Sequence, residues 1–142
     1  MNFKKILQYI ISGRSQTSST RGHLQEYGNQ RQIRESEAKY RNFFQTSRDA
    51  VFITTISGEW IDMNDATVEL FGYRNKEELK NTWVQNIYAN PRDRKRHIQK
   101  ITEQGFTKDF PMDLVKKDGT IINALITSVV VKNEEGKVIR FQ

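Results

Sequence analysis

The spacing of hydrophobic residues changes several times along this chain, and the first clear pattern lies in residues 24–47. Ile33, Tyr40 and Phe44 recur there at helix or heptad spacing, with Arg, Glu and Lys residues between them. Such a stripe predicts an amphipathic helix, which must bury its apolar side against a sheet or against a second copy of itself. The preceding residues 1–23 include the polar run SGRSQTSSTRGH, which is typical of a flexible linker.

A hairpin and a group of short helices are predicted next. Residues 50–56 are β-branched and aromatic, and after a Ser-Gly-Glu turn residues 60–64 alternate between apolar and polar. Asn64 or Asp65 is placed to cap a short helix through a side-chain oxygen. Gly72 is placed to end that helix in the left-handed conformation, and the sequence KEELK begins another short helix.

A longer helix is predicted between Asn90 and Gly105. Pro91 follows the asparagine at a first-turn position, where proline is well tolerated. Ile98 and Ile101 form the apolar side of this helix, and the glycine ends it.

The remainder of the chain is predicted to be β. Residues 106–117 alternate between apolar and polar, and Pro111, which cannot donate a ladder hydrogen bond, favours an edge strand. Residues 121–131 are apolar on both faces, as expected of a central strand that is covered on both sides. Residues 138–142 begin a last strand that the chain end truncates. Helices grouped between two runs of antiparallel strands predict an α+β fold.

Composition narrows the chemistry that this fold can carry. The chain has no Cys, which excludes disulfides, thiolate catalysis, Cys-ligated zinc and iron–sulfur clusters, and it fits a reducing, cytoplasmic compartment. The formal charge is +6, and residues 1–49 account for most of it with nine basic and four acidic residues, against fourteen and thirteen in residues 50–142. The basic character therefore belongs to an N-terminal arm. The apolar run ILQYII is too short for a membrane span and lacks the cleavage site of a signal peptide.

Catalytic motifs are missing from the sequence. It contains no phosphate-cradling Gly-rich loop, no metal-spaced His pair and no Ser/His/Asp set. The carboxylates fall in turns and at helix starts, where capping accounts for them. We therefore expect the chain itself to be neither an enzyme nor a metal protein.

Three stretches together resemble the PAS family of sensor domains. They are AKYRNFFQTSRDAVFIT, then GEWIDMNDATVELFGYRNKEEL, then LVKKDGTIINALITSVVV with NEEGKVIRF. The resemblance implies a five-stranded antiparallel sheet with short helices over one face, which enclose a cavity, and an amphipathic helix before it. It divides the chain into a basic flexible arm (1–23), a helix or linker (24–47) and the PAS domain (48–142).

The resemblance also implies a role in signal transduction. A PAS domain is typically the input part of a larger protein, so we expect an effector beyond Gln142, such as the histidine kinase of a two-component system or a diguanylate cyclase. The module would bind a small ligand or transmit packing changes through dimerisation. The alternative is a protein–protein interaction or dimerisation module with a filled core and no ligand.

One face of the predicted strands and the apolar side of the helices are the candidates to line a ligand pocket. The same side chains would form a solid core if no ligand binds, and spacing alone does not separate these hypotheses. The candidates are Ile53, Met63, Trp83, Ile87, Ile98, Ile101, Phe110, Met112, Leu114, Ile122, Ala124, Ile126 and Ser128.

The opposite face of residues 121–131 is expected to couple the domain to the leading helix. A shift of this strand would reach the helix stripe and change the geometry of a homodimer. The residues in this route are Ile33, Tyr40, Phe44, Ile121, Leu125 and Val129.

His97 is the one candidate cofactor ligand. Some PAS members hold haem through a His on the corresponding helix, and the position of His97 four residues before Ile101 would let it face inward. However, it ends the run RDRKRH, which is typical of a solvated face, and haem is not expected. The light-sensing relatives need a Cys for the flavin adduct, so this subclass is excluded and the cofactor remains unknown.

Two further partner classes are not expected. The basic cluster on the predicted long helix is interrupted by Asp93 and has no interleaved aromatic residues, which favours a solvated face over a nucleic-acid site; it comprises Arg92, Arg94, Lys95 and Arg96. The first residues could present a short apolar face to a membrane surface, made of Phe3, Ile6, Leu7 and Ile10.

Overall fold

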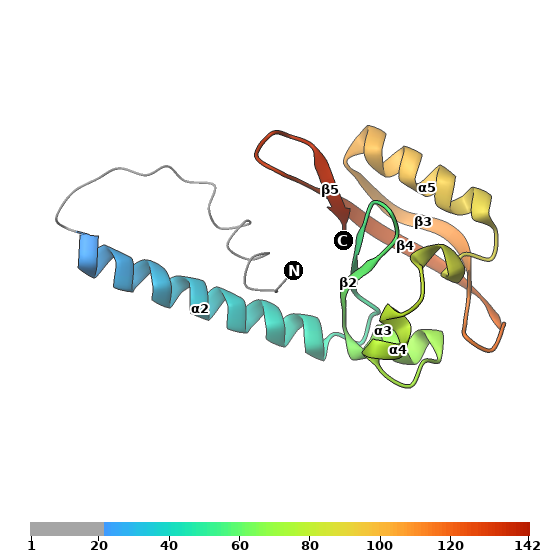
Figure 1. Cartoon of the computed structure of the whole chain (residues 1–142), viewed down its shortest axis with the longest axis horizontal. Coiled ribbons are helices and arrows are strands. Elements are labelled where there is room, and N and C mark those ends of the chain that lie inside the picture. The colour runs from blue at the N-terminus through green and yellow to red at the C-terminus, as the bar shows by residue number, and fades with distance from the viewer. Residues whose placement is uncertain (1–21) are drawn as a thin grey trace. The chain divides into compact units, whose positions relative to one another are not determined.

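The computed structural model describes residues 22–142, which fall into two units with their boundary between Thr46 and Ser47. The first unit is the helix α2 (Gly22–Thr46), 25 residues long, and the second is an α+β unit (Figure 1). The membrane-facing candidates between residues 3 and 10 lie outside the described residues. None of the helices in the described part is long and apolar enough to cross a membrane.

The second unit begins with the hairpin of β1 (Phe52–Thr55) and β2 (Trp60–Met63). Its turn requires a glycine at position 58, because the backbone φ there is +102° and a Cβ would lie 2.0 Å from Oε1 of Gln85. The side chain of Gln85 in turn donates to the carbonyl of Ser57 at 2.7 Å. The hairpin tip is thus fastened to the segment that follows the short helices.

The short helix α3 (Asp65–Phe71) ends where the sequence predicts. Asn64 is its N-cap and accepts from the backbone N–H of Thr67, and Gly72 closes it in the left-handed conformation at φ 74°. Asn64 is fully buried and also accepts from the N–H of Val51 at 3.0 Å. Asn64 therefore caps the helix, as the sequence predicts, and also joins the helix start to the segment just before β1.

Three more helical segments complete the roof over the sheet. They are α4 (Lys76–Lys80), the 3-10 turn η1 (Val84–Ile87) and α5 (Pro91–Gln104). Asn75 and Asn90 cap α4 and α5 through their side chains, which satisfies backbone N–H groups at each helix start. The helix α5 runs alongside the strand β3 (Figure 1).

Five strands form one antiparallel sheet in the order β2-β1-β5-β4-β3. The last three are β3 (Phe106–Val115), β4 (Ile121–Lys132) and β5 (Val138–Phe141). This confirms the predicted α+β, five-stranded fold, and it places β3 at the edge, where Pro111 was expected.

The prediction that residues 121–131 form the central strand is wrong. The short strand β5 holds the centre because it pairs with both β1 and β4, whereas β4 lies next to the edge. The outer face of β4 is also open, with Ile121 60%, Leu125 68% and Val129 43% exposed. The apolar residues on the two faces of β4 therefore have different surroundings: one face packs against the core, and the other is open to solvent.

The helical side of the sheet carries the core. Its buried members come from both hairpins and from every short helix, and Trp60 packs its ring edge-on to Phe52 and Phe71 at centroid distances of 5.4 and 6.3 Å. A bulge in β3 between Thr107 and Phe110, with Asp109 at φ 48°, adjusts the edge strand to this core.

Candidate functional site

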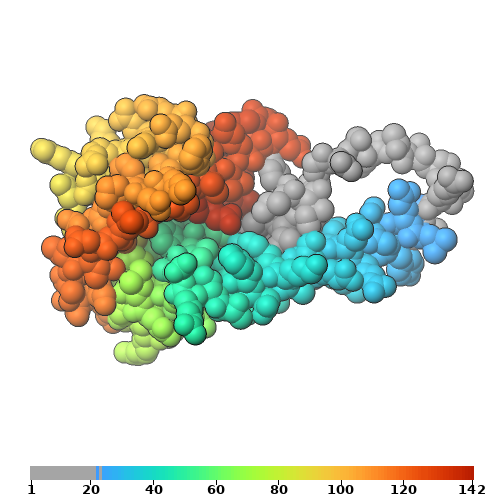
Figure 2. Space-filling view, turned by 180° about the vertical axis from the view of Figure 1, so that it is seen from behind, coloured from blue at the N-terminus to red at the C-terminus, as the bar shows by residue number. Residues whose placement is uncertain are grey.

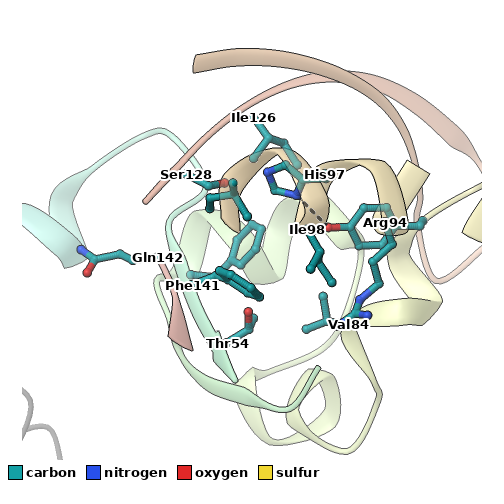
Figure 3. A pocket seen from close by; sticks show the side chains of 12 residues that line it. Thr54, Val84, Arg94, His97, Ile98, Ile126, Ser128, Phe141 and Gln142 are labelled. Atoms are coloured by element: carbon teal, nitrogen blue, oxygen red, sulfur yellow. Dashed lines mark hydrogen bonds between the residues drawn. The ribbon is translucent and has the colours of Figure 1, made fainter. Parts of the chain in front are cut away.

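A small cavity lies between α5 and the sheet (Figure 3). Its volume is about 30 Å³, close to the share of one water molecule in the liquid. Side chains from the helical roof and from the strands β1, β4 and β5 surround it. The lining residues are Phe52, Thr54, Val84, Tyr88, Arg94, His97, Ile98, Ile101, Ile126, Ser128, Phe141 and Gln142.

His97 is a buried polar residue of the cavity wall. Its ring is only 6% exposed, and its two nitrogens are both engaged: Nε2 lies 3.1 Å from Oγ1 of Thr107 and Nδ1 lies 3.4 Å from the hydroxyl of Tyr88. The dashed line in Figure 3 marks the latter bond. Burial lowers the pKa of His97, and the nearby Arg94 guanidinium lowers it further.

The expected solvated position of His97 is therefore wrong. It follows the exposed Arg96 in sequence, but the helix turns it inward because it shares the α5 face of Ile101, which is fully buried. Since both ring nitrogens already have hydrogen-bond partners, an axial bond to haem iron would require one of these bonds to break. The cavity volume also lies far below that of a ligand pocket.

Tyr88 and Arg94 close the cavity at the roof. Burial raises the pKa of Tyr88 to about 12, against the opposing effect of the Arg94 charge, so the phenol stays neutral. The Arg94 guanidinium donates to the carbonyl of Ile56 at 3.0 Å and so connects α5 to the β1–β2 turn. Arg94 is thus a positioning cation, while the rest of its basic run lies at the helix surface.

The structure brings some of the predicted pocket residues to the cavity and distributes the others. Ile98, Ile101, Ile126 and Ser128 line it. A second group lies in or against the adjacent packed core, and it consists of Met63, Ile87, Phe110, Met112, Leu114, Ile122 and Ala124.

Two predicted pocket residues lie elsewhere. Trp83 is 50% exposed, because it precedes η1 in an extended conformation while Trp60 fills the buried aromatic position. Ile53 is buried, but strand alternation places it on the opposite face of β1 from Phe52 and Thr54, which line the cavity.

Sequence reasoning missed several lining residues. On β1 the prediction chose the wrong face: it named Ile53, whereas the neighbouring residues on the opposite face line the cavity. The sequence of an apolar strand does not indicate which of its faces meets the cavity. Tyr88 and Phe141 lie at element ends, where no periodic pattern marks an inward side chain. Tertiary contacts alone identify them.

The predicted coupling residues occupy two surfaces. On α2, Tyr40 and Phe44 stack with ring centroids 5.7 Å apart, and Phe44 is buried. On the sheet, Phe106 lies in register with Val129 and is itself 55% exposed, so it extends the open apolar face of β4. We call the exposed residues Phe106, Ile121, Leu125 and Val129 the outer face.

Among the described residues, no group of three or more His, Asp or Glu side chains is placed to hold a metal ion.

In the space-filling view, α5 (yellow to orange) and the β3–β4 hairpin (orange) lie directly against one another (Figure 2). The exposed basic side chains of α5 lie on the outer surface of this layer.

Comparison with known proteins agrees with this architecture. The PAS domain family model matches residues 48–142. A PAS domain from Colwellia psychrerythraea is 25% identical, with a TM-score of 0.64 over 77% of this chain and 91% of that one. No curated protein matches the chain significantly.

Two further solved structures share the fold. A PAS domain from a two-component sensor histidine kinase is 21% identical, with a TM-score of 0.60 over 76% of this chain and 92% of that one. A domain of a sensory box sensor histidine kinase/response regulator from Geobacter sulfurreducens is 16% identical, with a TM-score of 0.57 over 77% and 94%. The chain therefore belongs to the PAS domain family of sensory and signalling modules.

Proposed function

We propose that this chain is the input module of a larger signal-transduction protein, and that it works through packing and dimerisation with its core filled. The observation that carries the proposal is the cavity of about 30 Å³, which is one tenth or less of a typical small-molecule site. Similar domains in solved structures come from sensor histidine kinases, so a kinase or a diguanylate cyclase is the class of effector that we expect.

The strand β4 is the element suited to carry a change in packing. Ile126 and Ser128 line the cavity on one of its faces, while the neighbouring Leu125 and Val129 belong to the outer face. Because successive residues of a strand point to opposite sides, a displacement of β4 at the cavity moves the outer face as well. A partner that binds two positions of β4 with different affinity would convert this displacement into a signal.

A second copy of the chain is the partner that we propose for the outer face. The helix α2 carries the partly exposed apolar residues Ile33 and Tyr40, next to the buried Phe44, and the outer face presents exposed apolar side chains on two paired strands. Exposed apolar patches of this kind commonly mark interaction sites. In such a dimer, a displacement of the sheet in one copy would be transmitted to the α2 stripes of both copies.

Sedimentation of the purified chain tests this route. We expect a dimer in the native chain and a shift toward monomer in the variants Leu125→Asp and Tyr40→Asp, because a carboxylate at a buried apolar interface is unfavourable. Ile56→Asp is the matched control, since Ile56 is also exposed (42%) but lies at the β1–β2 turn. A dimer unchanged by Leu125→Asp, or an equal loss with the control, would contradict the proposal.

Native mass spectrometry separates the filled module from a ligand-binding sensor. We expect the mass of the unliganded chain and no thermal shift against a metabolite panel. A stoichiometric additional mass would show instead that the cavity opens to admit a ligand, as in the ligand-binding version of the PAS hypothesis.

A further inference from the structure

We propose that His97 is an acid-sensitive latch, in which protonation of the buried ring releases α5 from the sheet and opens the cavity. The proposal goes beyond the packing-based function because it names the proton as an input to the module. It rests on the position, the hydrogen bonds and the charged surroundings of the ring.

The His97 ring connects three elements of the unit. It belongs to α5, its Nε2 meets Thr107 on β3 and its Nδ1 meets Tyr88, which directly follows η1. Tyr88 also pairs with Leu114 of β3 through an isolated bridge. The ring therefore holds α5 against the edge strand and against the rest of the roof.

The direction of one of the two hydrogen bonds depends on a neutral ring. A neutral imidazole donates from one nitrogen and accepts at the other, whereas an imidazolium donates from both. After protonation, one of the two hydroxyls must stop donating to the ring and direct its proton elsewhere. Within residues 22–142 neither the Tyr88 nor the Thr107 hydroxyl has another hydrogen-bond partner, so protonation would leave a buried donor unsatisfied.

The positively charged side chains of α5 disfavour an additional positive charge on the His97 ring. The Arg94 guanidinium already acts on the ring, and the Arg96 and Lys100 side chains lie 5.6 and 5.5 Å from the centroid of Phe110. The Phe110 ring in turn lies 5.2 Å from that of His97, centroid to centroid. Asp93, one turn before His97, is engaged by Arg96 at 3.1 Å.

The sheet offers no described carboxylate to compensate. On β3, Lys108 and Asp109 are exposed and follow Thr107 around the bulge. The cavity wall from β1, β4 and β5 is uncharged and consists of Phe52, Thr54, Ile126, Ser128 and Phe141. Arg140 alternates with Phe141 and so lies on the other face of β5.

The direction of the pH effect follows from these surroundings. Burial and Arg94 lower the pKa of His97 in the folded state, whereas an unfolded or released ring titrates near about 6.5. The released state thus binds the proton more tightly, and the latch is stable above pH of about 6.5. As the pH falls from there toward the folded-state pKa, the opening equilibrium constant rises by up to about tenfold per pH unit.

A proton titration of the full chain by NMR tests the proposal directly. The ring signals of His97 should titrate below about pH 6.5, the ordinary value of a histidine side chain. Hydrogen exchange supplies the second readout. After correction for intrinsic rates, the protection of α5 amides should fall as the pH drops below about 6.5, by up to about tenfold per pH unit, while that of α3 stays constant.

The variant His97→Gln supplies the matched test, because it keeps a polar group that cannot be protonated. Its α5 protection should not depend on pH, whereas His23→Gln should respond as the native chain does. A His97 pKa at or above about 6.5 would overturn the proposal. Equal α5 protection at both pH values, or an unchanged pH response in His97→Gln, would also overturn it. If His97→Gln does not fold, the titration and exchange of the native chain decide alone.

Discussion

At the residue scale, Asn64 shows how one side chain fixes the geometry around the roof. Its Oδ1 accepts from the backbone N–H groups of Val51 and Thr67, at 3.0 and 3.1 Å, and its Nδ2 donates to the carbonyl of Asp49 at 2.8 Å. The side chain is completely buried. It therefore satisfies backbone groups of the strand entry and of the helix start that no water can reach.

Replacing Asn64 by Ala should lower the free energy of unfolding by about 2–4 kcal/mol, because the helix cap is lost and buried N–H groups stay unpaired. Urea denaturation measures this. The control Glu69→Ala, at an exposed position of the same helix α3, should change stability by less than about 0.5 kcal/mol. Equal effects of the two substitutions would contradict the role of Asn64 as a helix cap and as a partner of buried backbone groups.

At the element scale, α5 is the helix whose packing defines the cavity. Ile101 is fully buried and Ile98, three residues earlier, is half-buried, and both line the cavity. Ile101 thus faces the sheet, while Ile98 lies toward the cavity rim. Replacing each of the two isoleucines by Ala therefore distinguishes the stability that comes from core packing from the stability that comes from contacts at the cavity rim.

Ile101→Ala should cost about 2–4 kcal/mol of unfolding free energy, because it removes buried methyl groups and enlarges the void. Ile98→Ala, with less buried surface, should cost about half as much or less. Thermal or urea denaturation gives both values. If Ile98→Ala were the more destabilising change, the placement of α5 over the sheet would be wrong.

The edge strand β3 illustrates how an element is protected from unwanted pairing. Pro111 removes a backbone donor, and the bulge at Asp109 interrupts the regular ladder. These features discourage association through the open edge. The dimer that we propose would therefore use the outer face and not the edge of β3.

At the scale of the whole molecule, the described part of the chain consists of a long helix and an α+β unit joined at residues 46–47. The helix α2 is mostly polar and exposed, with Leu24 90%, Tyr27 74% and Phe43 68% accessible. By contrast, the second unit has a contiguous core. Local stability should therefore differ between the two units.

Limited proteolysis with trypsin should cut α2 before the second unit and leave a resistant fragment that begins between residues 32 and 42. The basic residues of α2 lie on an exposed helix, whereas those of the second unit belong to a packed sheet and its roof. Mass spectrometry of the products identifies the fragment. Early cleavage within residues 50–142 would show that the second unit is the less stable one.

The sequence by itself determined the local elements and the family. Caps such as Asn64 and Asn90, the glycines that end helices, and Pro111 at the edge act through nearby backbone groups, so their effect can be predicted from residue type and spacing. The combination of short helices with two hairpins then pointed to the α+β fold. These predictions succeeded because each depends on contacts close in the sequence.

Only the tertiary structure decided which strand is central, which faces are covered and which side chains surround the cavity. Four-residue β5 takes the centre because it pairs with β1, which is far away in the sequence, as well as with the preceding strand β4. His97 turns inward from a basic run because of contacts with Thr107 and Tyr88. Periodicity identifies an apolar face but not its partner, because a core, a dimer interface and a ligand pocket all select the same residue types.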